Sequence, residues 1–456
     1  MNSKPQSSLT NRASGRVFRP GRELVYQIFP DRWKNARPDR NPADGSWNWK
    51  KEPVRFTTDH SLLTGQRTDQ YHFFGGDLEG VRESLPYLQD LGVTAVYMTP
   101  IFQARSTHRY DAVDYMTIDP ALGTREDFEA LAGDLRKRKM KLVLDGVLNH
   151  TSEEHPWHTD PDMRKEHYIM KADGQPMSWL NHGSLPKLDP QNPQVAKKLL
   201  EVLDAWPEAD LWRLDAAHLL PQEFLRQLRS HVAPRPILIE DWSYCPHYFR
   251  KNIADAVTNF LFRDAVRTFF IQDASPETLL ERLEIWIRTY PRRNLGLSWN
   301  FLDNHDTERF ISLAGRDSLM RALVLLFTLP GTPMLYHGCE VGMKGKTTGE
   351  SRAPMEWDES KWDRGIFDHV KSLAKLRREH PVLATGGFTP LFADNRSRAF
   401  AFERTDRASR AVIALNDGYL PGCFHDQGTD WTLDPGSWRI EITEKHHPVT
   451  VLVFSA

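Results

Sequence analysis

Short apolar runs rich in Val, Ile and Leu recur along roughly the first 380 residues, and stretches with helical spacing of apolar positions separate them. This alternation is typical of a parallel α/β sheet. The expected strands span residues 24–29, 93–99, 141–147, 211–216, 237–240, 256–260, 297–302 and 333–336. Eight parallel strands predict a closed (β/α)8 TIM barrel with its functional groups at the carboxyl ends of the strands.

Two regions depart from this alternation. Residues 151–192, after the third strand, are rich in His, Pro, Asp and Trp and show little periodicity, so we expect a loop excursion over the strand ends, a short domain B. Alternating runs at 398–403, 411–415, 438–443 and 449–454 predict a C-terminal antiparallel β-sandwich domain. The predicted domains are a disordered leader (1–20), a barrel (21–150 and 193–382), the excursion (151–192) and the β domain (383–456).

The composition excludes several classes of protein. The 59 Lys and Arg against 61 Asp and Glu give a net charge of -2, so the basic surface of a dedicated nucleic-acid binder is not expected. No apolar run approaches the length of a membrane-spanning helix, and the polar first 20 residues do not resemble a signal peptide. Three isolated cysteines predict neither a disulfide framework nor a paired-cysteine zinc site. We therefore expect a soluble cytoplasmic protein.

Three acidic residues stand where predicted strands end, and they are the candidates for chemistry. Asp215, Glu240 and Asp306 each follow an apolar run. A single acid after a strand is commonly the N-cap of the next helix. In a barrel, however, all three positions face one cleft, so three such acids together favour a shared catalytic site.

Four short segments resemble, in the right order, the signature regions of the α-amylase superfamily, glycoside hydrolase family 13. They are DGVLNH at 145–150, WRLDAAH at 212–218, ILIE at 237–240 and NHD at 304–306. Segments at 26–32, 73–80, 108–111 and 185–189 are similar to the neopullulanase, cyclomaltodextrinase and maltogenic amylase group, and maltodextrin glucosidases share much of this pattern. The resemblance implies a retaining α-glucan hydrolase acting on α-1,4 bonds, with α-1,6 bonds as a second linkage, in short maltooligosaccharides or cyclodextrins.

The resemblance also implies a role for each acid. Asp215 would be the nucleophile, Glu240 the acid/base, and Asp306 the group that binds sugar hydroxyls and favours the distorted ring. Retaining chemistry needs one carboxylate to attack and one carboxylic acid to protonate the leaving oxygen, about 5 to 5.5 Å apart. Arg213 lies two residues before Asp215, on the same side of the strand, and we expect it to bind substrate-site carboxylates and to keep Asp215 ionised.

Further side chains are candidates for substrate binding. By resemblance, Tyr110 is the aromatic platform under the sugar whose bond is cleaved. His150 and His305 stand beside motif acids, where a neutral imidazole donates a hydrogen bond to a sugar hydroxyl. His218 would help to define the subsite beyond that bond, with the start of a helix as the alternative reading. Asp145 is expected to orient Arg213.

We expect no required cofactor. His150, His155 and His158 do not follow the His-Glu-x-x-His spacing of zinc hydrolases, and Pro156 interrupts the helix that such a site needs. Relatives hold a structural calcium ion after the first strand, and this resemblance leaves a calcium site open here. Its candidate ligands are Asn35, Asp39, Asn41, Gly75 and Asp77, although Arg37 and Arg40 place cations beside it.

Three hypotheses on function stay in view. Many members of the group carry a further β domain before the barrel, which dimerises and walls off the cleft, whereas only about 20 residues precede Val25 here. We therefore expect a monomeric hydrolase that prefers short linear dextrins. A transglycosylase, either a glucanotransferase or an isomerising synthase, would use the same covalent intermediate. A non-catalytic binding relative is a remote alternative, because all three acids are present.

Overall fold

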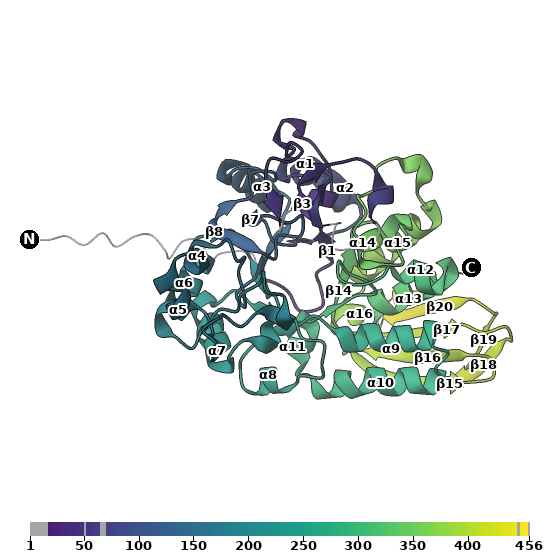
Figure 1. Cartoon of the computed structure of the whole chain (residues 1–456). Coiled ribbons are helices and arrows are strands. Elements are labelled where there is room, and N and C mark those ends of the chain that lie inside the picture. Colours follow the sequence, from purple (N-terminus) through teal and green to yellow (C-terminus); the bar gives the residue numbers. More distant parts are fainter. Residues whose placement is uncertain (1–16, 50–51, 64–69, 445–446, 455–456) are drawn as a thin grey trace, which may run out of the picture.

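The structure is a computed structural model that describes residues 17–49, 52–63, 70–444 and 447–454 (Figure 1). Most of the predicted leader, residues 1–16, lies outside this part. Residues 17–20 do not behave as a disordered leader, because Phe18 is buried in the apolar cluster that fills the barrel, and Gly21 N–H donates to the Gly296 carbonyl at 2.7 Å. The leader boundary predicted at residue 20 is therefore wrong: the ordered barrel begins before it.

The predicted eight-stranded parallel barrel is confirmed. The strands follow one another in the order β12-β11-β10-β9-β6-β1-β14-β13, and a parallel bridge between Thr258 and Trp299 joins the two ends of this sheet. Alternate side chains, such as those of Val25, Val143 and Leu211, point inward and fill the barrel. The strands are β1 Val25–Ile28, β6 Ala95–Met98, β9 Lys141–Gly146, β10 Leu211–Leu214, β11 Ile237–Ile239, β12 Ala256–Val257, β13 Trp299–Asn300 and β14 Thr332–Tyr336.

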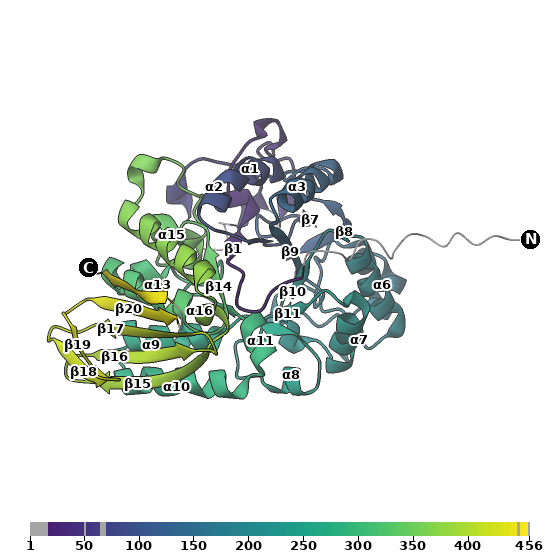
Figure 2. The same ribbon diagram turned by 180° about the vertical axis from the view of Figure 1, so that it is seen from behind.

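Amphipathic helices surround the barrel and cover its outer face (Figure 2). In α3 (Arg125–Lys137), Thr124 and Asp127 form a capping box, and Phe128, Leu131 and Leu135 are buried. The other helices of the barrel are α1 Leu78–Glu83, α2 Leu85–Asp90, α6 Pro193–Asp204, α7 Gln222–Val232, α8 His247–Arg250, α9 Phe260–Ile271, α10 Pro276–Thr289, α11 Arg292–Leu297, α12 Phe310–Ala314, α13 Arg316–Thr328, α14 Thr348–Ser351, α15 Arg364–Glu379 and α16 Pro381–Thr385.

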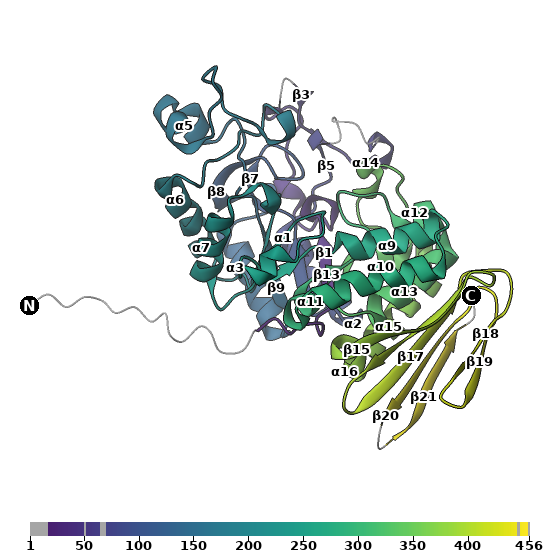
Figure 3. The ribbon, with the colours of Figure 1, turned by 90° about the horizontal axis from the view of Figure 1, so that it is seen from below.

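Short strands and two small helices build the loops above the barrel. Within 151–192, prolines start α4 (Pro156–Thr159) and α5 (Pro161–His167), which the weak periodicity did not predict, and Asp160 caps α5 with its side chain. The loop strands are β2 Asn48–Trp49, β3 Glu52–Pro53, β4 Arg55–Phe56, β5 His72–Phe73, β7 Phe102–Ala104 and β8 Ala112–Ile118. The excursion and the C-terminal sheet lie at opposite ends of the molecule (Figure 3).

The C-terminal domain is an antiparallel sheet that packs against barrel helices. Its five strands are ordered β15-β16-β17-β20-β21, and a hairpin, β18–β19, covers one face through a cluster that includes Ala401, Val412 and Trp431. On the other face, Phe400 contacts Phe269 of α9, with ring centroids 5.3 Å apart. The strands are β15 Gly387–Asp394, β16 Ala399–Thr405, β17 Ser409–Asn416, β18 Gly422–Asp426, β19 Thr429–Leu433, β20 Trp438–Glu444 and β21 His447–Phe454.

The sequence predicted four of these strands and missed β15 and the hairpin. β15 begins at Gly387 and contains Pro390 beside a register shift, which are features that weaken a strand pattern. β15 is an edge strand, where a proline is tolerated because one side of the strand needs no hydrogen bonds. In the described part of the chain, no helix is long and apolar enough to cross a membrane.

Candidate active site

The three acids that the sequence singles out line one pocket of about 560 Å³ at the carboxyl ends of the barrel strands, here called the strand-end pocket. Asp215 directly follows β10, and Glu240 directly follows β11. Asp306 stands on the loop that leaves β13. The exposed fractions of Asp215 and Glu240 are only 8% and 7%, so both carboxyls are shielded from bulk water while facing the pocket.

One buried guanidinium, that of Arg213, holds three carboxylates together. Its Nη1 donates to Asp215 Oδ1 at 2.8 Å and to Asp145 Oδ1 and Oδ2 at 2.9 and 3.0 Å. Its Nη2 lies 3.0 Å from Glu240 Oε2. Arg213 therefore fixes Asp215 and Glu240 relative to one another, and Asp145 orients Arg213 as expected.

The backbone turn after β10 adds a further contact to Glu240. Ala216 adopts a left-handed conformation with φ 45°, which is uncommon for a residue with a side chain. Its N–H donates to Glu240 Oε2 at 3.1 Å. Glu240 Oε2 is thus held by two donors, whereas Glu240 Oε1 has only a long 3.4 Å contact with the Trp242 indole N–H. The oxygen Oε1 is therefore the one left to meet a ligand.

The acids outnumber the cation that holds them, and this excess shapes their protonation. Burial raises the pKa of Asp215 well above its ordinary range, while Arg213 opposes the shift and the charges of Glu240, Asp145 and Asp306 add to it. Burial also raises the pKa of Asp145 against the pull of Arg213. Without substrate, Arg213 alone does not offset burial and repulsion at Asp215, so the cluster favours keeping a proton.

Asp306 is held from the other side of the strand-end pocket by Arg352. Arg352 Nη2 donates to Asp306 Oδ1 at 2.9 Å, and Arg352 Nε donates to the His305 carbonyl at 2.6 Å. The side-chain nitrogen His305 Nε2 lies 3.1 Å from Asp306 Oδ2. Sequence reasoning missed Arg352, because it stands in an irregular loop after the last strand and follows no motif.

The predicted aromatic platform lies beside one of the predicted histidines. Tyr110 stands on the loop between β7 and β8, and its ring is stacked on that of His305 with centroids 5.5 Å apart. The Tyr110 hydroxyl donates to Asp145 Oδ2 at 2.9 Å and lies 2.7 Å from His305 Nε2. Gln27, on the first barrel strand, lies 2.7 Å from His305 Nδ1 and fixes that ring from below. Tyr110 is thus anchored within the acid cluster.

The buried histidines of the strand-end pocket are neutral at neutral pH. Burial lowers the pKa of His150 to about 3 and that of His108 to about 3, and it also lowers that of His305 well below its ordinary value. His150 Nε2 is buried and has no hydrogen-bond partner among the described residues. A neutral imidazole with a free ring nitrogen suits contact with an uncharged hydroxyl group.

Exposed apolar side chains flank the mouth of the strand-end pocket. Trp242 and Leu180 line it with exposed fractions of 52% and 67%, and Trp179 and His182 of the excursion lie beside Leu180. His218, a predicted subsite residue, is exposed and also lines the pocket. Flat or apolar faces at a polar cleft suit the faces of sugar rings. Sequence reasoning did not single out Trp242 or Leu180, because single exposed apolar residues in loops carry no pattern.

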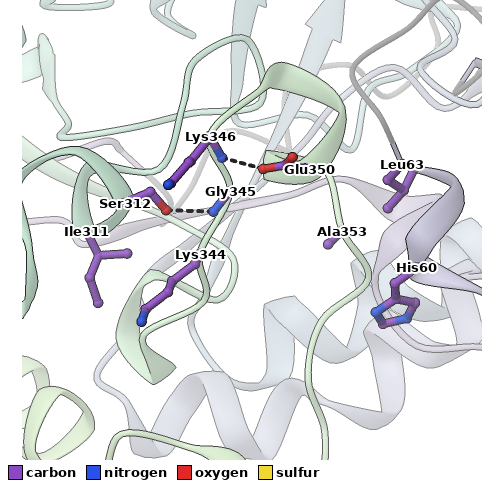
Figure 4. Close-up of a pocket in the computed structure, with 9 residues that line it drawn as sticks. All are labelled: His60, Leu63, Ile311, Ser312, Lys344, Gly345, Lys346, Glu350 and Ala353. Carbon is purple, nitrogen blue, oxygen red and sulfur yellow. Dashed lines mark hydrogen bonds between the residues drawn. The ribbon is translucent and has the colours of Figure 1, made fainter.

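A second, smaller pocket of about 440 Å³, here called the side pocket, adjoins this mouth (Figure 4). Ala353 lines the side pocket and the preceding residue, Arg352, lines the strand-end pocket. Gly345 N–H donates to Ser312 Oγ at 2.8 Å, and Lys346 N–H donates to Glu350 Oε2 at 2.7 Å, which fixes the loop between the two pockets.

The residues proposed for calcium are held by hydrogen bonds to one another and to the backbone. Asp77 Oδ2 accepts from Ala36 N–H at 2.9 Å and Arg37 N–H at 2.7 Å, and Asp77 Oδ1 accepts from Gly80 N–H at 2.7 Å. The Asn35 amide donates to Asn41 Oδ1, and a side chain at Gly75 would collide with both amides. Asp39 is paired with Arg37 at 2.8 Å. Calcium needs six to eight oxygen ligands, and this set, with its oxygens engaged by N–H donors, does not fit one.

Comparison with known proteins identifies the family. The model of the α-amylase catalytic domain matches residues 27–362. Neopullulanase 2 of Thermoactinomyces vulgaris is 34% identical over 86% of this chain and 69% of its own, and an intracellular maltogenic amylase of Bacillus subtilis is 30% identical over 86% and 68%. The structure of a cyclic α-maltosyl-(1→6)-maltose hydrolase from Arthrobacter globiformis superimposes with a TM-score of 0.83 at 29% identity, covering 94% of this chain and all of that one.

The chain therefore belongs to the α-amylase family, and it is a glycoside hydrolase of that family. This agrees with the fold and with the acid cluster at the strand ends, as the sequence motifs predicted.

Proposed function

We propose that the protein is a retaining α-glucan hydrolase in which Asp215 is the nucleophile and Glu240 the acid/base. The observation that carries this assignment is the shared hold of Arg213, whose Nη1 lies 2.8 Å from Asp215 and whose Nη2 lies 3.0 Å from Glu240. Two carboxyls fixed on one guanidinium at one pocket wall form the pair that a double displacement needs. Asp306 faces them across the pocket and would bind sugar hydroxyls.

The hydrogen bonds of the free enzyme assign a role to individual oxygens. Asp215 Oδ1 is bonded to Arg213, while Oδ2 has no partner among the described residues and is the oxygen placed to attack the anomeric carbon. Glu240 donates a proton from Oε1 to the glycosidic oxygen as the bond to the leaving sugar breaks. Glu240 then removes a proton from a water molecule, whose oxygen displaces Asp215. Two displacements at one carbon retain the α configuration.

The proton excess of the cluster serves this sequence. With Asp145, Asp215 and Glu240 all ionised, three negative charges would face one guanidinium in a buried site, so one retained proton is favoured. The mechanism requires this proton on Glu240 and the negative charge on Asp215. The positive charge that develops on the sugar in the transition state then pairs with the remaining carboxylates.

Short maltooligosaccharides and cyclodextrins are the proposed substrates, with α-1,4 bonds and also α-1,6 bonds cleaved. The related structure carries in its title a cyclic glucan with a (1→6) linkage, which supports the second linkage and a cyclic ligand. The strand-end pocket is bounded by the excursion, with Trp179 and Leu180 along its wall. A bounded pocket engages few sugar units, so kcat/KM should stop rising after a few glucose units.

We propose that the enzyme is a monomer and acts in the cytoplasm. Exposed large apolar side chains outside the strand-end pocket, such as Met116, Met163, Ile285 and Tyr419, stand singly on separate elements, and single exposed apolar residues do not make an interface. All three cysteines are free, as is usual in a reducing compartment, and one relative is named intracellular.

Proton NMR during the first minutes of maltotriose hydrolysis tests the mechanism. The α-anomer should appear first and convert slowly to the equilibrium mixture. Early β-anomer would contradict the double displacement and the role of Asp215. The same samples separate the alternative function, because products longer than maltotriose accumulating in place of glucose and maltose would identify a transglycosylase.

A further inference from the structure

The junction between the barrel and the C-terminal sheet contains a group of arginines that lack acidic partners. Arg377 of α15 and Arg404 of β16 are both fully buried, and neither forms an ion pair within the described residues. Burying a charge without an opposite charge is costly, so buried arginines are normally paired with carboxylates. This pair departs from that rule.

Backbone carbonyls take the place of carboxylates around both arginines. Arg377 donates to the carbonyls of Gly21, Phe327, Leu329, Gly331 and Leu383, and Arg404 donates to those of Thr328, Leu383, Gly386 and Gly387. These dipoles satisfy the donors but carry no net charge. Burial lowers the pKa of Arg377 to about 9, which leaves it protonated at neutral pH. The junction therefore keeps a positive charge that its own residues do not neutralise.

A pocket of about 530 Å³, here called the junction pocket, opens beside these arginines. Its wall includes Gly331, Gly386 and Gly387, whose carbonyls are bound by the buried guanidiniums. Carbonyls bound in this way are turned away from a ligand that they would otherwise repel. The junction pocket lies beside the residues that precede β13 and β14, at the end of the barrel opposite the strand-end pocket. The elements α11, α16 and β15 that meet there are visible in Figure 3.

Two further arginines line the junction pocket directly. Arg292 donates through Nη2 to the Thr385 carbonyl, which leaves its Nε and Nη1 without a partner among the described residues. Arg293 Nη1 lies 3.5 Å from Asp255 Oδ1, but Asp255 is bound more closely, at 2.9 Å, by Arg229. The charges of Arg377 and Arg292 both act on Arg404, so the lining arginine and the buried pair lie within electrostatic reach of one another.

We propose that the junction pocket is a binding site for a small organic phosphate, held by Arg292 and Arg293 in the field of the buried arginines. The planar guanidinium fork matches the oxygens of a phosphate group, and arginine binds phosphate with two parallel hydrogen bonds. The remaining wall includes Pro20, Ile287, Tyr290 and Phe388, which suits the carbon body of a phosphate ester better than a bare ion. This site is distinct from the acid cluster and does not depend on its proposed function.

Calorimetry and thermal unfolding with inorganic phosphate and with phenyl phosphate test this site, at constant ionic strength set with sodium chloride. Both ligands should bind the wild-type protein saturably and raise its Tm, and phenyl phosphate should bind at least as tightly as inorganic phosphate, because it also contacts the apolar wall. Arg292→Gln/Arg293→Gln should weaken both dissociation constants at least tenfold while leaving maltotriose hydrolysis unchanged.

A matched control is Arg136→Gln/Arg138→Gln, which removes two exposed arginines of α3 and should leave phosphate binding unchanged. Circular dichroism without phosphate checks that both double variants fold, and Arg293→Gln alone, which loses only the long contact with Asp255, replaces the first if it does not. Absence of a saturable phosphate effect in the wild-type protein would overturn the proposal, and so would an equal loss in the α3 control. Tighter binding of inorganic phosphate than of phenyl phosphate would reject the ester as the ligand.

Discussion

The two ends of the barrel carry opposite, unbalanced charge clusters. At the carboxyl ends of the strands, Arg213 faces three carboxylates, those of Asp145, Asp215 and Glu240. At the other end, Arg377 and Arg404 are buried with only carbonyls around them. A core that served stability alone would balance these charges, since unpaired buried charge is destabilising. The comparison teaches that each imbalance marks a place where a ligand or a reaction supplies the missing charge.

The largest effect is expected at the acidic end. Asp215→Asn and Glu240→Gln should each lower kcat on maltotriose by at least about 10² to 10⁴, because one removes the covalent route and the other the proton transfer. The fold should persist, since each amide keeps the shape of the acid. Steady-state kinetics with Asp264→Asn, an exposed acid on α9, as the control measures this. A tenth or more of wild-type activity in either variant would remove that residue from its assigned role.

The acidic end was predictable from sequence, whereas the basic end was not. Asp215 and Glu240 directly follow apolar runs that become β10 and β11, so the barrel topology alone brings them together. Arg377 and Arg404 stand in polar stretches that look like solvent-exposed positions, and only the packing of the C-terminal sheet on α15 and α16 buries them. Long-range packing of this kind leaves no local pattern in the sequence.

The irregular loops show the same limit on a smaller scale. Arg352 and Trp242 line the strand-end pocket but follow no strand or motif spacing, so sequence reasoning did not find them. The edge strand β15 was missed because glycine and proline weaken its pattern, although neighbouring strands supply its hydrogen bonds. Periodicity thus predicts what the core fixes, and contacts between distant loops have to be seen in the structure.

The next effect is expected at the basic end. Arg404→Met keeps much of the side-chain volume but leaves the carbonyls of Thr328, Leu383 and Gly386 without their donor. Unsatisfied buried acceptors should destabilise the junction by roughly 2 to 4 kcal/mol. Thermal unfolding should show a lower Tm, with Arg136→Met as an exposed control. If Arg404→Met instead raised the Tm, the charge would be a burden that no carbonyl offsets, and the comparison would lose its basic half.

A change of pH should separate the two ends, because it alters the buried histidines of the acidic end and leaves the arginines charged. The pKa of His150 is lowered to about 3, from an ordinary value of about 6.5 in the unfolded chain. The unfolded state therefore binds a proton first as the pH falls, so this contribution to stability is complete above pH of about 6.5 and declines towards about 3. Between about pH 6.5 and 5 the loss should be about 2 kcal/mol for this histidine.

His150→Gln should remove that part of the slope when the free energy of unfolding in urea is measured across the same range. The exposed His425→Gln should follow the wild-type profile. An unchanged slope in His150→Gln would mean that His150 is protonated in the folded protein. The neutral hydrogen-bonding role given to it would then fail, although the acid cluster would stand.

The smallest effect is expected in the loop after β1, where charges are balanced and no ion is needed. Arg37 pairs with Asp39, Arg40 pairs with Asp127, and Asp77 caps α1 through its carboxylate. We propose that this loop is stable without calcium, so EDTA should leave the Tm unchanged within experimental error. Asp77→Ala should cost about 1 kcal/mol through loss of the cap, equally with EDTA and with added calcium. A Tm that EDTA lowers in the wild-type protein but not in Asp77→Ala would show that Asp77 binds the ion, and the loop would then join the two barrel ends as a third site completed from outside.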